Sequence, residues 1–165
     1  REDRDVTFEL LSRESGIPVR TLYRYFESKE ALYAAFWPWL NKTIDVPDRP
    51  RDAEELIAHI PALFDAFDRD EPLVRAMLHH PLGRDARLAH AAARREKFAE
   101  ALRNVSMGMP AGETRCLLAA VTALCSASGW ETMKDNWGLS GSAAAEAAQW
   151  AVHALIKGAR REVAH

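Results

Sequence analysis

The side chains best suited to contact another molecule are two arginines one helical turn apart, Arg20 and Arg24. A guanidinium can donate two hydrogen bonds to the O6 and N7 atoms of guanine. Thr21 and Tyr23 flank the arginines, and a threonine can touch a thymine methyl group or a phosphate. Phosphate contacts are expected from three further residues: Thr7, Tyr25 and Lys29. The set predicts binding to DNA, although arginines on a helix are also typical of an ordinary solvated face.

Two short helices joined by a tight turn must position these side chains, and they are predicted within residues 7–26. Gly16 falls where the first helix must end, and glycine reaches the left-handed backbone conformation at little cost. Leu22 and Phe26, four residues apart, are predicted to face inward and so to turn the arginines outward. The pattern predicts a helix-turn-helix, whose second helix enters the major groove of DNA.

The stretch from Thr7 to Leu32 resembles the DNA-binding segment of the TetR family of bacterial repressors. The resemblance rests on Thr7, Leu11, Ser12, Gly16, Ile17, Thr21-Leu22-Tyr23, Tyr25-Phe26 and Lys29-Glu30-Ala31-Leu32. It implies that four side chains face the DNA: Arg20, Thr21, Tyr23 and Arg24. It also implies that three contact phosphates: Thr7, Tyr25 and Lys29.

Two features depart from the family pattern. The family has a helix before the position of Thr7, and only six residues precede it here, so the chain is expected to be incomplete at its N-terminus. Pro18 stands where a serine or threonine often caps the second helix. Proline is acceptable at the first position of a helix, but the side-chain cap is expected to be lost.

The remainder of the chain is also expected to be helical, because the 3.6-residue hydrophobic period recurs and no segment alternates as a strand does. The sequence predicts an all-α protein with a helix-turn-helix domain at 1–45 and a ligand-sensing and dimerisation domain at 46–165. Eight helices are predicted, at about 7–14, 18–25, 28 to beyond 39, 52–69, 72–79, 84–104, 111–136 and 142–161. Pro38 is expected to bend the third helix, and Pro61 to kink the fourth or end it early.

The last predicted helix is rich in alanine and is expected to form a dimer interface. Trp137-Gly138-Leu139-Ser140, followed by an alanine-rich helix with Trp150, is similar to the closing helix pair through which TetR-family proteins dimerise. The expected interface residues are Ala147, Trp150, Ala151, Ala154, Leu155 and Gly158. An ordinary internal packing helix is the alternative, since alanine is a strong helix former.

The family resemblance also implies a small-molecule pocket in the middle of the chain. Its expected lining residues are Phe64, Phe67, Met77, His79, Trp130 and Met133. The apolar members of this set are more often plain hydrophobic core, and His79 is expected as a polar contact.

Composition and motifs favour no other chemistry. The chain has 165 residues, a net charge of −2 and two cysteines, which suits a reducing, cytoplasmic setting. It has no apolar run near the roughly 20 residues that span a bilayer. Phosphate-loop, dinucleotide-loop and nucleophile-elbow motifs are absent, as is zinc-ligand spacing, so we expect no enzyme, cofactor or metal.

The resulting hypothesis is a homodimeric repressor that a small molecule releases from a palindromic operator. Two alternatives stay open. One is a helical dimerisation or ligand-carrier module that does not bind DNA, and the other is an enzyme on a helical scaffold.

Overall fold

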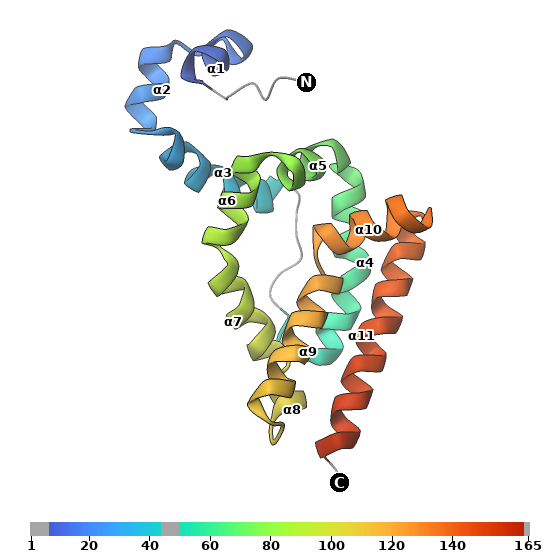
Figure 1. Ribbon diagram of the computed structural model, residues 1–165. Coiled ribbons are helices and arrows are strands. Elements are labelled where there is room, and N and C mark those ends of the chain that lie inside the picture. Colours follow the sequence, from blue (N-terminus) through green and yellow to red (C-terminus); the bar gives the residue numbers. More distant parts are fainter. Residues whose placement is uncertain (1–6, 44–49, 164–165) are drawn as a thin grey trace. The chain divides into compact units, whose positions relative to one another are not determined.

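The computed structural model describes residues 7–43 and 50–163, and every element in these two ranges is a helix (Figure 1). The predicted all-α class is confirmed for this part of the chain. The chain divides into two compact units, an N-terminal unit that ends at Asn41 and a C-terminal unit that begins at Lys42. The domain boundary predicted between residues 45 and 46 lies outside the described residues and stays a prediction.

Three helices begin in the N-terminal unit: α1 (Phe8–Ser15), α2 (Val19–Tyr25) and α3 (Lys29–Thr43). Each begins within one residue of its predicted start. The starts are predictable because the capping and turn signals there are local in sequence. The first two pack against each other. The third continues through Pro38 to Thr43.

The C-terminal unit carries the other described helices. They are α4 (Ala53–Arg69), α5 (Glu71–His79), α6 (Pro81–Ala89), α7 (Ala91–Ala101), α8 (Arg103–Ser106), α9 (Ala111–Leu124), α10 (Ala127–Trp137) and α11 (Gly141–Val163). Helices α4 and α11 lie side by side along this unit, and α9 packs against α11 (Figure 1).

The core of the C-terminal unit is built from the apolar faces of these helices. Ile60 and Phe64 of α4, Trp130 of α10 and Val152 of α11 are each at most 1% exposed. Burying a side chain of this size stabilises a fold by about 1.5–3 kcal/mol. The 3.6-residue stripe in the α4 sequence therefore faces the core as the periodicity predicts.

Helix α4 runs from Ala53 to Arg69, close to the predicted range 52–69, and does not end early at Pro61. Proline removes the N–H that would bind the carbonyl of Ile57, four residues earlier. The side-chain amide of Gln149 on α11 donates to that carbonyl instead, at 2.9 Å. Packing against α11 thus compensates for the missing bond.

Two of the predicted helices are divided, which corrects the prediction. The segment 84–104 contains the end of α6, all of α7 and the start of α8. The segment 111–136 breaks between α9 and α10, which are bent by 62°. Ser126 caps α10 by accepting a hydrogen bond from the N–H of Gly129 at 3.1 Å. A Cβ on Gly129 would lie 2.5 Å from the carbonyl oxygen of Ala123, so the tight break requires glycine there.

No single described helix is long and apolar enough to cross a membrane. Helices α9 and α10 pass that test only together, as a bent pair, and by length and composition alone.

Candidate DNA-binding surface

The turn between α1 and α2 depends on Gly16. Its backbone is left-handed, with φ of 71°, and its N–H donates to the carbonyl of Ser12 at 2.9 Å. A Cβ at this position would meet no atom within 4 Å, so the backbone angle rather than space favours glycine. Helix α1 therefore ends where the sequence predicts.

A small apolar contact holds the two helices together. Phe8 of α1 is 3% exposed and Leu22 of α2 is 8% exposed. The ring of Tyr23 packs edge-on against Phe8, with 4.4 Å between the ring centroids. Tyr23 is nevertheless 52% exposed, so one part of its side chain supports the fold while another part is open to solvent.

Thr7 and Pro18 begin the two helices in different ways. The hydroxyl of Thr7 accepts a hydrogen bond from the N–H of Leu10 at 3.1 Å, which is a side-chain cap for α1. Pro18 makes no side-chain cap for α2, as expected. Its carbonyl instead accepts from the N–H groups of Thr21, at 2.8 Å, and Leu22, at 3.2 Å.

The outward face of α2 carries exposed cations. Arg20 and Arg24 are exposed, Thr21 is half-buried, and Tyr25 is 69% exposed. The guanidinium of Arg24 lies over the ring of Tyr25, at 5.1 Å from its centroid. Such a contact holds both side chains on the surface.

Lys29 extends the basic surface to the start of α3. The hydroxyl of Ser28 caps this helix by accepting from the N–H of Ala31 at 3.1 Å. Neither Lys29 nor the two arginines of α2 form an ion pair within the described residues. Their charges are therefore available to an external anion such as a DNA phosphate.

The sequence of this segment matches a known family. Residues 4–36 match the family described as "Bacterial regulatory proteins, tetR family". The segment is that of a tetR-family regulator. The match over this segment supports a TetR-type DNA-binding regulator. No curated protein and no solved structure matches the chain.

The residues that were predicted for a TetR-type ligand pocket lie mainly in the core of the C-terminal unit. Phe67 packs against Phe64, with 6.1 Å between centroids, and edge-on against Trp130 at 5.8 Å. Met77 and Met133 are half-buried. The structure thus brings the three aromatic rings together, and the assignment of the set to a pocket stays a prediction.

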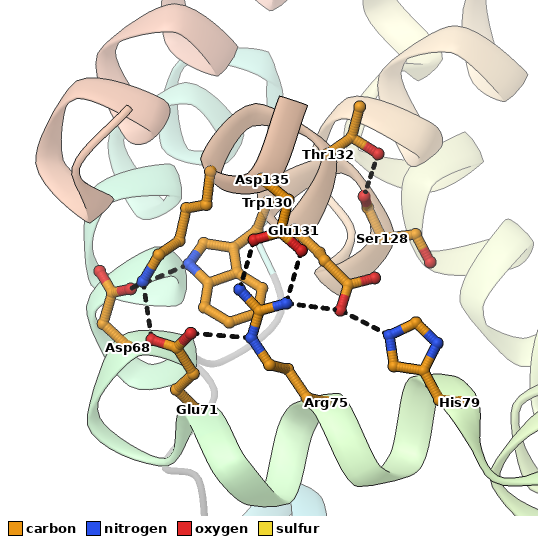
Figure 2. Close-up of polar contacts among 10 residues, drawn as sticks. Asp68, Glu71, Arg75, His79, Ser128, Trp130, Glu131, Thr132 and Asp135 are labelled. Carbon is orange, nitrogen blue, oxygen red and sulfur yellow. Dashed lines mark hydrogen bonds and ion pairs between the residues drawn. The ribbon is translucent and has the colours of Figure 1, made fainter. Parts of the chain in front are cut away.

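The sixth predicted pocket residue, His79, belongs to a polar network between α5 and α10 that the sequence did not reveal (Figure 2). Arg75 donates to Glu71 at 2.7 Å, to Glu131 at 3.0 Å and to Asp135 at 2.6 Å. Nε2 of His79 lies 2.8 Å from Glu131. The hydrogen bond from Arg75 lowers the pKa of Asp135 and so favours its charged form.

The same network includes the buried indole of Trp130 (Figure 2). The indole N–H donates to Asp68 at 3.1 Å, and Lys134 binds Asp68 at 2.5 Å and Glu71 at 2.8 Å. Lys134 and Arg75 both lie over the indole ring, at 4.8 and 5.3 Å from it. These contacts join α4, α5 and α10 through charged groups more than 50 residues apart in sequence.

The residues that were predicted for the dimer interface lie on one face of α11. None of the six is among the buried core residues, and Trp150 is 77% exposed. The core face of the helix carries other residues: Ala144, Ala145, Ala148, Val152, Ile156 and Ala159. The interface assignment stays a prediction. Four of its residues are exposed, whereas Ala147 and Ala151 are half-buried.

Proposed function

We propose that this TetR-type regulator is a homodimeric repressor that leaves a palindromic operator when a small molecule binds its C-terminal unit. The observation that carries the DNA-binding part is the exposed pair Arg20 and Arg24 on α2. Thr21 and Tyr23 complete the surface for base edges, while Thr7, Tyr25 and Lys29 contact phosphates. Guanine is the base that an arginine fork recognises best.

The exposed residues on one face of α11 support the proposed dimerisation. Exposed tryptophan beside small residues is typical of a surface that another helix covers, because alanine and glycine allow close approach. We propose Ala147, Trp150, Ala151, Ala154, Leu155 and Gly158 as the interface. A two-fold dimer would present two α2 helices to half-sites about 34–36 Å apart, one turn of DNA.

Release of the operator is proposed as a population shift. An effector that binds one spacing of the recognition helices more tightly than another lowers DNA affinity by its differential affinity for the two states. We place the effector in the C-terminal unit near α5 and α10, the helices that carry Met77, His79, Trp130 and Met133. Phe64 and Phe67 of α4 complete the proposed surroundings.

A mobility-shift assay of the whole chain with DNA from its own upstream region tests this function. We expect retardation that weakens with salt, and a loss of sequence preference of about tenfold or more for Arg20→Ala. Lys29→Ala should weaken binding to all sequences and reduce the salt slope by about one. Arg13→Ala is the matched control, because Arg13 is exposed on α1 and its ion pair among the described residues is with the adjacent Glu14, at 3.5 Å.

The proposal predicts that Arg20→Ala alters specific DNA binding and that the control Arg13→Ala does not. Equal DNA binding by Arg20→Ala and Arg13→Ala would contradict the assignment of α2. A folded dimer that binds no DNA specifically would contradict the function.

A further inference from the structure

Arg84 and Arg87 of α6 and Arg94 of α7 lie close enough for their charges to interact. Arg87, in the last turn of α6, donates to the carbonyl oxygens of Met77 and, at 3.3 Å, of Leu78. These carbonyls lie at the end of α5, where a helix carries partial negative charge. Arg87 is thereby held in place, and no ion pair among the described residues joins it to a carboxylate.

Arg94 on α7 is the least satisfied of the group. Its Nε atom is buried and has no hydrogen-bond partner. Within the described chain no ion pair includes Arg94. Burial, followed by the charge of Arg95, lowers the pKa of Arg94, because a desolvated cation is less stable.

Among the described residues, the charges that act on Arg87 are mostly positive. Burial lowers the pKa of Arg87, and the charges of Arg94 and Arg84 lower it further. Glu131 is the acidic group that opposes this effect, but it already binds Arg75 at 3.0 Å and His79 at 2.8 Å. A cation removed from water is costly unless an anion binds it.

We propose that Arg94, together with Arg87, binds the oxyanion group of an effector, which is an organic acid or a phosphate compound. A guanidinium fork matches a carboxylate or phosphate with two parallel hydrogen bonds. Phe98 lies one turn after Arg94 on α7 and is half-buried, so it offers apolar contact to the rest of an organic acid. This inference rests on the proposed function, because it assigns a ligand class to the unit proposed to sense the effector.

Thermal unfolding of the whole chain with sodium octanoate, or with sodium phosphate, at constant ionic strength tests the proposal. A rise in Tm of about 3 °C or more is expected for wild type at saturation with at least one probe. Arg94→Met should unfold at a higher temperature than wild type without a probe and should lose the rise. Arg95→Met is the matched control and should keep it, because Arg95 is the exposed neighbour.

Each outcome decides the inference. A rise with octanoate alone identifies a carboxylate with an apolar tail, and a rise with phosphate alone identifies a phosphate compound. No rise in wild type, or a rise that Arg94→Met retains, overturns the inference. If Arg94→Met does not fold, Arg94→Lys serves instead, because it keeps the charge but loses the fork and should reduce the rise.

The mobility shift separates this inference from the proposed function. Wild type that binds its operator but gains no stability from either probe overturns the oxyanion site alone. A chain that is stabilised through Arg94 but binds no DNA overturns the repressor proposal alone.

Discussion

The side-chain amide of Gln149 on α11 donates a hydrogen bond of 2.9 Å to the backbone carbonyl of Ile57 on α4. In an uninterrupted α-helix that carbonyl would accept from the N–H of residue 61, which is proline. A partly buried carbonyl without a partner is costly. The contact therefore explains how α4 passes through Pro61 and remains the helix against which α11 packs.

Gln149→Leu is expected to lower the free energy of unfolding by about 1–3 kcal/mol, because the Ile57 carbonyl is left without a partner. Urea unfolding measures this change. Pro61→Ala restores the backbone donor, so the loss caused by Gln149→Leu should largely disappear in the Pro61→Ala background. Equal losses in the two backgrounds would show that the hydrogen bond does not compensate for Pro61.

Trp150→Glu is expected to convert a dimer to monomers at micromolar concentration, because it places a charge in the proposed apolar interface. Sedimentation velocity measures the change. Leu88→Glu is the control, since Leu88 on α6 is 60% exposed and lies on another helix. A Trp150→Glu protein that sediments like wild type would contradict the proposed interface.

Arg75→Met is expected to destabilise the C-terminal unit most at neutral pH. Hydrogen bonds from Lys134 and Arg75 lower the pKa of Glu71, and one from Arg75 lowers that of Asp135. Carboxyl groups with a lowered folded-state pKa stabilise a protein above their ordinary pKa and lose that effect as pH falls. The Tm difference between wild type and Arg75→Met should therefore narrow between about pH 6 and about pH 3.

The control for this pH series is Arg69→Met, which removes an exposed arginine at the end of α4. Its Tm should follow that of wild type at every pH. A Tm difference between wild type and Arg75→Met that stays constant with pH would mean that Arg75 does not lower the pKa of these carboxyl groups.

Gly83→Ala is expected to destabilise the protein by about 1–3 kcal/mol through overpacking. A Cβ on Gly83 would lie 2.0 Å from the carbonyl oxygen of Met77 and 2.9 Å from its Cα, so the backbones of α5 and α6 must move apart. Gly112→Ala on α9 is the control, because its Cβ would meet no atom within 4 Å. Thermal unfolding should separate the two variants, and similar Tm values would contradict the close approach.

Local signals in the sequence sufficed for the helix-turn-helix. Gly16 ends α1 because of its own backbone angle, and Leu22 faces inward because of its spacing. The cap at Ser28 likewise involves a partner only three residues away. Such interactions are complete within one or two helical turns, so a single sequence displays them.

The breaks in the later helices needed more than local signals. Ser126 caps α10 within a run of sequence that is otherwise suited to one long helix. The end of α7 at Leu102, which is fully buried, has no glycine or proline to mark it. Helix propensity barely distinguishes a break there from continuation, so packing decides.

The sequence by itself determined the helical class, the turn at Gly16 and the outward arginines of α2, because each depends on residues within a few positions. Only the tertiary structure decided that Gln149 completes α4, that Arg75 meets Glu131, and that Nε of Arg94 is buried without a hydrogen-bond partner. Arg75 and Glu131 are 56 residues apart, and Gln149 and Ile57 are 92 apart. Contacts at such separations depend on the path of the whole chain, which no local period or motif encodes.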